Sequence, residues 1–263
     1  MNDDTDFERR DERKFGGIAR LYGAEGAQRI GQAHVCVIGI GGVGSWAAEA
    51  LARSGVGRIT LIDLDHVAES NINRQSQADD ATLGQAKVLA MQERIARINP
   101  QCNVTCVEEF IDTENIAALM PACDAVIDAI DQVRAKAALA AHCTRNQVLL
   151  VMTGGAGGRI DPTRVCIDDL SRTTQDALAS KVRARLRSEH GFTRDPKKKF
   201  GIECVYSPEQ IRRPDEFCEV EAPEDKRGID GLNCAGYGSS VAVTSTFGMV
   251  AAARVLTLLA TKR

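Results

Sequence analysis

Short apolar runs alternate with longer segments whose apolar residues recur at helical spacing over much of the chain. The runs are rich in β-branched residues and predict five strands, at residues 35–40, 58–62, 103–107, 125–127 and 148–152. The segments between them predict four helices, at residues 45–54, 81–98, 113–120 and 132–145. Strict alternation of strands and helices predicts an α/β fold with a doubly wound, mostly parallel, Rossmann-like sheet.

The last third of the chain is less regular. A strand is predicted at residues 164–167 and a helix at 176–188, and the acidic segment 216–230 lacks periodicity, so we expect a crossover loop there. Residues 241–260 are apolar over a length that fits a bilayer. Polar or charged residues and glycine interrupt this segment, at Thr244, Ser245, Thr246, Gly248 and Arg254. We therefore expect a C-terminal helix that packs against the sheet, and no membrane insertion.

Composition limits the picture further. The chain has 263 residues, of which 44% are hydrophobic, which is enough for a sizeable core. Its formal net charge of -3 and pI of 5.9 do not indicate a nucleic-acid-binding protein, so any such site must be a local patch. The nine cysteines include no CxxC pair, and the N-terminus lacks an apolar signal segment. Reduced thiols and a cytoplasmic location are therefore expected.

The stretch from Val35 to Gln75 carries the clearest chemistry. A strand enters the glycine turn Gly39-Ile-Gly41-Gly42-Val-Gly44, and a helical pattern follows, an arrangement that favours a nucleotide phosphate at the helix N-terminus. The next predicted strand ends at Asp63, which is 19 residues past Gly44 (63 minus 44) and suits a ribose hydroxyl. This fingerprint alone is shared by NAD dehydrogenases.

Residues after Asp63 favour phosphoryl or nucleotidyl transfer over hydride transfer. An acid, two amides, a guanidinium and a third amide follow closely, at Asp65, Asn71, Asn73, Arg74 and Gln75. Arginine is a planar, permanently charged group that suits phosphate oxygens. Lys87 follows in a predicted helix, and Asp128 and Asp131 follow the fourth strand, so cations and carboxylates surround one nucleotide.

Taken together, these motifs resemble a known superfamily. GxGGxG, DxDxVxxSNxNRQ, the lysine in GxxK and DAIDxxxxK are similar to the ubiquitin-activating and thiamine/molybdopterin adenylyltransferase superfamily, over about residues 16–158. Within it, the chain resembles the tRNA threonylcarbamoyladenosine dehydratase branch through FGGIARLYG, VMTGGAGGRIDPT and NCAGYGSSVAVTSTFG. Residues 1–14 are dense in charge and are expected to form a mobile leader. The resemblance implies two further parts: a nucleotide-binding adenylyltransferase core at 15–158, and a substrate- and tRNA-facing extension with the C-terminal helix at 159–263.

The resemblance also implies an activity, in which the carboxylate of threonylcarbamoyladenosine in tRNA attacks ATP and the resulting acyl-adenylate closes into a ring. Arg74 and Lys87 are then the catalytic cations, and Asp131 is both catalytic and the Mg²⁺ ligand. Arg20 is expected to reach the partner subunit's ATP in a homodimer. The full ATP-binding set expected is Gly39, Gly41, Gly42, Gly44, Asp63, Asp65, Asn71, Asn73, Arg74, Gln75, Lys87, Asp128, Asp131 and, in trans, Arg20.

A basic segment is the candidate contact for tRNA. Residues 181–199 hold eight Lys or Arg against Glu189 and Asp195, a local balance of +6 on a chain that is negative overall. Charge runs are usually solvated faces, but this asymmetry favours RNA phosphates. The candidate RNA-binding residues are Lys181, Arg183, Arg187, Lys197, Lys198 and Lys199.

Cys234 leaves a second function open. It lies among glycines rather than in an apolar run, so it is the candidate reactive thiol. One alternative is therefore a sulfur-relay protein that uses Cys234 and a sulfur-transfer partner protein. Another is an adenylyltransferase for the C-terminus of a ubiquitin-like carrier, although such relatives usually hold zinc between two CxxC pairs that this chain lacks.

Overall fold

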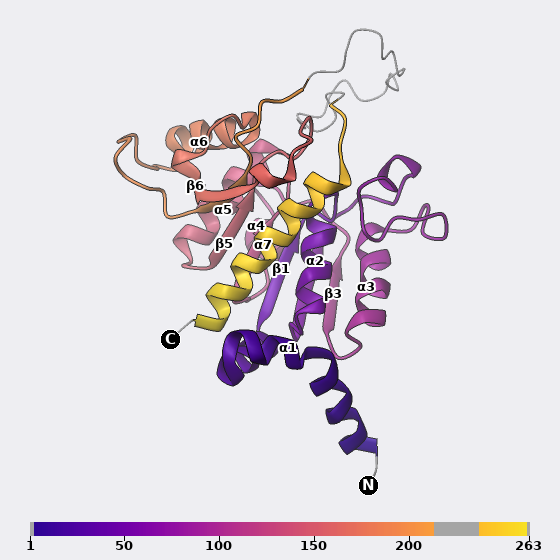
Figure 1. Cartoon of the computed structure of the whole chain (residues 1–263). Coiled ribbons are helices and arrows are strands. Elements are labelled where there is room, and N and C mark those ends of the chain that lie inside the picture. Colours follow the sequence, from indigo (N-terminus) through magenta and orange to yellow (C-terminus); the bar gives the residue numbers. More distant parts are fainter. Residues whose placement is uncertain (1–2, 213–236, 262–263) are drawn as a thin grey trace.

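One mixed sheet forms the centre of the protein, in a computed structural model that describes residues 3–212 and 237–261. Its strand order is β3-β2-β1-β4-β5-β7-β6 (Figure 1). All neighbouring strands are parallel except β6 and β7. The strands are β1 (His34–Ile38), β2 (Arg58–Ile62), β3 (Asn103–Val107), β4 (Ala125–Asp128), β5 (Leu149–Thr153), β6 (Cys166–Asp169) and β7 (Glu203–Tyr206).

Helices cover both faces of the sheet, as the alternating pattern predicts. They are α1 (Asp3–Gln32), α2 (Gly44–Arg53), α3 (Lys87–Ile98), α4 (Ile116–Leu119), α5 (Val133–Arg145), α6 (Ala177–Glu189) and α7 (Val241–Thr261). Side chains of β1 alternate between the two faces: Val35 and Val37 join the core under α2, α3 and α7, whereas Cys36 and Ile38 join the core under α4 and α5. The doubly wound α/β prediction is confirmed.

Helix α7 is long and apolar enough to cross a membrane by length and composition, yet it packs as a core helix. Phe247, Ala251 and Val255 are fully buried against the sheet and its neighbouring helices. Arg254 also forms a bidentate ion pair with Glu203 of β7, at 2.5 and 2.6 Å. The expectation of a C-terminal helix packed on the sheet is therefore confirmed.

Several element boundaries differ from the predicted ones. Helix α3 begins at Lys87 rather than near residue 81, because Gly84 adopts φ +80° and Ala86 pairs with His66 in an isolated antiparallel bridge. Helix α4 has four residues, so it is shorter than the 113–120 segment predicted. Strand β7 was not predicted, since ECVY is a run of four residues between Gly201 and Pro208.

Secondary structure continues across both ends of the predicted core. The chain is helical from Asp3, within the expected leader, and α1 continues to Gln32 with a break at Gly23, where φ is +77°. At the other boundary, β6 and β7 continue the sheet beyond β5, so the extension after residue 158 shares the sheet with the residues before it. The predicted loop at 216–230 lies outside the described residues.

Gly248 lets α7 approach α2 closely, and this contact generates a prediction. A Cβ at this position would lie 2.4 Å from the Val43 carbonyl oxygen and 2.9 Å from the Ala47 nitrogen. Alanine normally stabilises an exposed helix interior by about 1 kcal/mol relative to glycine. Here we expect Gly248→Ala to lower the free energy of unfolding by about 2 kcal/mol, because the helices must separate.

Chemical denaturation would measure this change, and Met249→Ala, on the more exposed side of the same helix, is the control. A Gly248→Ala protein that is more stable than the parent would show that the α2–α7 approach is not tight.

Candidate active site

The carboxyl ends of three neighbouring strands define the site. Ile38 of β1 pairs with Ile62 of β2 on one side and with Asp128 of β4 on the other. The glycine turn, Asp63 and the segment 129–131 therefore leave the sheet side by side. This edge, at the point where the strand order reverses between β1 and β4, is where doubly wound sheets bind nucleotides.

The glycine turn is held by close packing on one side and is open on the other. Gly39 has φ +85°, and a Cβ there would lie 2.8 Å from the Ala129 carbonyl oxygen. A Cβ on Gly44, the first residue of α2, would lie 1.8 Å from the Gly39 oxygen. By contrast, a Cβ on Gly41 would meet no atom within 4 Å. Packing thus explains Gly39 and Gly44, whereas Gly41 leaves room for a ligand at the N-terminus of α2.

Asp63 is fixed beside this turn. Its Oδ2 accepts a hydrogen bond from the Ile40 N–H at 2.6 Å, and its Oδ1 accepts one from the Asp65 N–H at 2.8 Å. Burial raises the pKa of Asp63, although Lys87 and the two N–H donors oppose this rise. Each carboxylate oxygen keeps a further lone pair, so it can accept a hydrogen bond from a ribose hydroxyl.

Lys87 opens α3 on the same edge of the sheet. Its Nζ lies 2.7 Å from Asp65 Oδ2, and its backbone N–H donates to the Asp65 carbonyl at 2.9 Å. Lys87 is only 6% exposed, whereas the Asp65 side chain is 54% exposed. The partner carboxylate can therefore swing into solvent, and the buried ammonium can then meet a phosphate oxygen.

Arg74 lies across the glycine turn. A Cβ on Gly42 would lie 3.2 Å from Arg74 Cγ, so the arginine stem packs beside that glycine. Its Nη1 donates to the Ser70 carbonyl and to Asn73 Oδ1, and its own carbonyl accepts from Trp46 Nε1 at 2.9 Å. The structure thus brings Arg74 to the turn that the sequence predicts for phosphates.

The predicted amides have protein partners that shape this loop. Asn71 Oδ1 accepts from the Ala68 N–H at 3.2 Å, and Asn73 Nδ2 donates to the Ser239 carbonyl at 3.3 Å. Gln75 is buried and accepts from Gln77 Nε2, which also donates to the Ile40 carbonyl at 3.1 Å. Sequence reasoning missed Gln77, because a buried amide that ties two loops together has no local signal.

Asp128 and Asp131 have different environments. Asp128 is fully buried, and its Oδ1 accepts from Lys136 Nζ at 2.9 Å and from the Ile130 N–H at 3.0 Å. Burial raises the pKa of Asp128 despite the attraction of Lys136. The sequence predicts Asp128 as an ATP ligand, but this pairing gives it a structural role under the turn. Asp131 is half-buried and makes no hydrogen bond to the described chain, so it is the carboxylate that remains available.

The remaining predicted residues lie elsewhere. Arg20 is exposed on α1, five residues after Phe15, whose ring packs against Gly55 just before β2. Helix α1, which carries it, lies near the amino ends of the strands, whereas the glycine turn follows the carboxyl end of β1 (Figure 1). Cys234 lies outside the described residues. No group of three or more His, Cys, Asp or Glu within the described ranges could hold a metal ion by itself.

The basic segment divides into two kinds of residue. Arg183 donates to the Thr173 side chain and to its carbonyl at 3.0 Å, and Arg187 donates to the Thr193 carbonyl and lies 5.2 Å from the centre of the Phe200 ring. These arginines stabilise α6 and the loop after it. The predicted RNA-binding residues that are exposed are Lys181, Lys197, Lys198 and Lys199.

Comparison with known proteins agrees with this geometry. Residues 16–263 match the ThiF family, which is almost the whole chain. The chain belongs to the ThiF family. The predicted resemblance to the adenylyltransferase superfamily is thereby confirmed.

One dehydratase relative of this ThiF chain is similar over nearly its full length. It is 50% identical over 248 residues, 92% of each chain, to the tRNA threonylcarbamoyladenosine dehydratase of Escherichia coli. The crystal structure of the E. coli dehydratase in complex with ATP matches with a TM-score of 0.84 and 48% identity, over 94% of each chain. The E. coli molybdopterin-synthase adenylyltransferase is 38% identical over 144 residues, 55% of this chain and 57% of that protein.

The buried pair of Lys136 and Asp128 yields a stability prediction. Replacing Lys136 by methionine leaves Asp128 buried without its partner, so we expect the free energy of unfolding to fall by about 3 to 5 kcal/mol. The Asp128→Ala/Lys136→Met double variant should recover much of this loss, because no unpaired charge remains. Arg134→Met, an exposed position on the same helix, is the control. Equal stabilities of the single variant and the parent, measured by denaturant titration, would contradict the role of the pair.

Proposed function

We propose that this ThiF-family chain is an ATP-dependent, adenylating tRNA-modifying enzyme that dehydrates threonylcarbamoyladenosine in tRNA to a cyclic product. The observation that carries the proposal is similarity along nearly the whole chain to a dehydratase with a structure in complex with ATP. The open side of the glycine turn, with Arg74 and Lys87 beside it, supports the same activity because it offers space and charge for a triphosphate.

The chemistry needs two steps. In the first, an oxygen of the substrate carboxylate forms a bond to the α-phosphorus of ATP, and the bond from that phosphorus to the bridging oxygen breaks, so pyrophosphate leaves. In the second, a nucleophilic atom of the threonylcarbamoyl group forms a bond to the activated carbonyl carbon and loses its proton, and the bond from that carbon to the phosphate oxygen breaks, so AMP leaves with the electron pair. A carboxylate alone would have to expel oxide, so adenylation supplies the leaving group. No protein nucleophile is required.

Named residues have separate roles in this scheme. Asp63 binds the ribose hydroxyls, and Arg74 and Lys87 stabilise the charge that develops on the phosphates. Lys87 exchanges its bond to Asp65 for a phosphate oxygen. Asp131 fits Mg²⁺, because Mg²⁺ is usually held by one or two carboxylates together with substrate phosphates. Mg²⁺ would supply further neutralisation of the triphosphate, and Asp131 would orient it.

The proposed partners are tRNA and a second copy of the chain. Exposed Lys181 and Lys197–199 are candidates to contact RNA phosphates, whereas the internal bonds of Arg183 favour a structural role for it. Arg20 is exposed and distant from its own glycine turn, which supports action on the partner subunit's ATP rather than its own. A cytoplasmic location accords with a tRNA substrate.

Two alternatives have weaker support. A carrier-protein adenylyltransferase accounts for the nucleotide site, but the similarity to such a relative covers 55% of this chain. A sulfur relay would depend on Cys234 and a sulfur-transfer partner. Burial raises the pKa of Cys102, Cys106 and Cys123 to about 11, so these three thiols are poor nucleophiles and could not replace it.

The product is the direct test. Purified protein with ATP, Mg²⁺ and tRNA that carries threonylcarbamoyladenosine should yield AMP, pyrophosphate and a nucleoside lighter by one water. Arg74→Ala and Lys87→Ala should each remove transition-state stabilisation of about 3 kcal/mol or more, a loss above a hundredfold. Nucleoside mass spectrometry and phosphate release measure both results.

Cys234→Ser should retain the reaction, and Arg97→Ala, on an exposed site of α3, is a charge control. Release of ADP instead of AMP would refute the adenylate. AMP release that depends on a small carrier protein would favour the adenylyltransferase alternative.

The proposed dimer can be tested by complementation. Neither Arg20→Ala nor Arg74→Ala protein should be active alone. After subunit exchange, half of the dimers are mixed and each has one intact site, so about a quarter of the parental activity should return. A mixture that stays inactive although native mass spectrometry detects mixed dimers would mean that Arg20 does not act in trans.

A further inference from the structure

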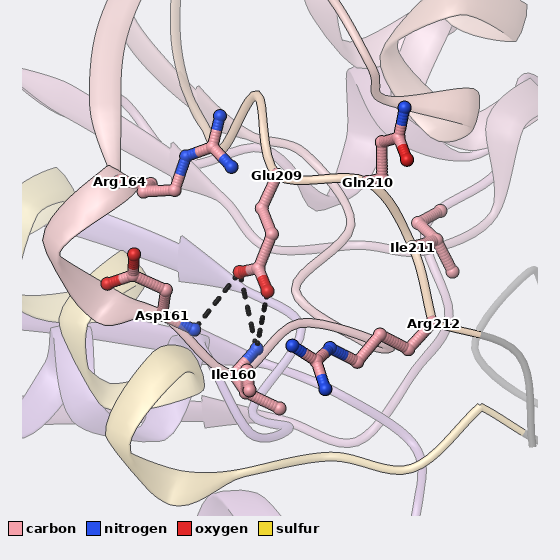
Figure 2. A pocket seen from close by; sticks show the side chains of 7 residues that line it. All are labelled: Ile160, Asp161, Arg164, Glu209, Gln210, Ile211 and Arg212. Atoms are coloured by element: carbon pink, nitrogen blue, oxygen red, sulfur yellow. Dashed lines mark hydrogen bonds between the residues drawn. The ribbon is translucent and has the colours of Figure 1, made fainter.

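A cavity lies between the segments that follow β5 and β7. It has a volume of about 550 Å³, within the range of small-molecule pockets. Two chain segments form it, one after β5 and one after β7, as Figure 2 shows. The residues that matter to its chemistry are Ile160, Asp161, Arg164, Glu209 and Arg212.

The carboxylates of this pocket, Glu209 and Asp161, already accept hydrogen bonds from the protein itself. Glu209 is buried and accepts hydrogen bonds from the Ile160 and Asp161 N–H groups, at 3.2 and 3.0 Å. Asp161 accepts from the Thr163 N–H at 3.0 Å and from its hydroxyl at 2.5 Å, and these bonds lower the pKa of Asp161. Both groups therefore hold the loop 160–163 in place.

The side chains of the two arginines, by contrast, have unused hydrogen-bond donors. Within the described residues, Arg164 and Arg212 donate no side-chain hydrogen bond and form no ion pair, although both guanidinium groups point into the pocket (Figure 2). A guanidinium has five N–H donors and no acceptor. The pocket thus offers unused donors while its acceptors are satisfied, so it suits an anion. Ile160, which is 55% exposed, adds an apolar surface beside them.

A chain of hydrogen bonds connects the pocket to the nucleotide site. The Arg212 N–H donates to the Gly158 carbonyl, and the Gly158 N–H donates to the Gly238 carbonyl, both at 2.8 Å. The next carbonyl, that of Ser239, accepts from Asn73, which in turn accepts from Arg74 at 2.9 Å. A single segment, residues 238–239, therefore separates the pocket from the arginine at the glycine turn.

We propose that this pocket binds a tRNA nucleotide adjacent to the modified adenosine. Arg164 and Arg212 contact its phosphate, and Ile160 contacts its base or sugar. This inference rests on the proposed function, because it assumes that tRNA presents its adenosine at the nucleotide site. A nucleotide carries both a phosphate and an apolar face, which is the chemistry that the pocket offers, and arginine is the residue best suited to a phosphate.

The test measures tRNA binding separately from turnover. Arg164→Gln and Arg212→Gln should each raise the Kd and the KM for modified tRNA about tenfold, the value of one charge-assisted contact. Each should also flatten the dependence of log Kd on log salt by about 0.7, as expected for one phosphate of a single strand. The KM for ATP and the kcat at saturating tRNA should not change. Arg164→Lys keeps the charge and should keep the salt slope.

Arg97→Gln is the matched control, because it removes one exposed arginine from the last turn of α3. Unchanged tRNA affinity in both pocket variants would overturn the inference. A second result would also overturn it: the parent protein binds two AMP molecules per chain and each pocket variant binds only one. The pocket would then hold a free nucleotide. Absence of the cyclic product with the parent protein would instead refute the proposed function, and the tRNA affinities would still decide the pocket.

Discussion

The active site depends on the buried ion pair between Lys136 and Asp128. Lys136 donates to the carboxylate and the carbonyl of Asp128 and to the Ile130 carbonyl, so one ammonium fixes the whole turn after β4. The Ala129 carbonyl in this turn is the atom that excludes a side chain at Gly39, and the Ala129 side chain lies 3.2 Å from the position of a Cβ on Gly44. The path of the glycine turn and the position of Asp131 are thus both set by this buried pair of charges. A buried pair of this kind is costly to desolvate, so its value here is geometric precision rather than stability.

The extension beyond β5 completes the site instead of forming a separate unit. Strand β7 adds to the sheet in parallel and is tied to α7 by Glu203 and Arg254, and β6 closes the edge in the antiparallel direction. The first turn of α7 then returns to the glycine turn, because a Cβ on Gly42 would lie 3.5 Å from Thr244 Cβ. The nucleotide site is consequently enclosed by residues that are about 200 positions apart in sequence (244 minus 42).

Local patterns predicted the parts of this structure that depend on local forces. The strands at 58–62 and 103–107 were predicted with their observed bounds, because both are short runs rich in β-branched residues, although only β2 is largely buried. Gly39, Gly44 and Asp63 could be predicted because turn geometry requires them at fixed spacing. Lys136 and Gln77 could not be assigned their roles, since a buried lysine or amide has meaning only through a partner that tertiary structure supplies. The start of α3 was wrong because Gly84 and the bridge of His66 with Ala86 override helical periodicity.

A cluster of lysines and arginines in the sequence does not by itself show that their hydrogen-bond donors are free to bind an anion, and this protein gives examples of both cases. The basic run at 181–199 has a local balance of +6. Even so, the side-chain donors of Arg183 and Arg187 already bond backbone carbonyls and a side-chain hydroxyl, and Arg187 lies against an aromatic ring. Arg164 and Arg212 lie in segments with no excess of charge, but within the described residues their donors are unused. An anion binds more readily to donors without a partner, because a donor that is already bonded must first break that hydrogen bond, at a cost of about 1 kcal/mol or more. A structure therefore shows which arginines keep unbonded donors, which a count of lysines and arginines along the sequence does not.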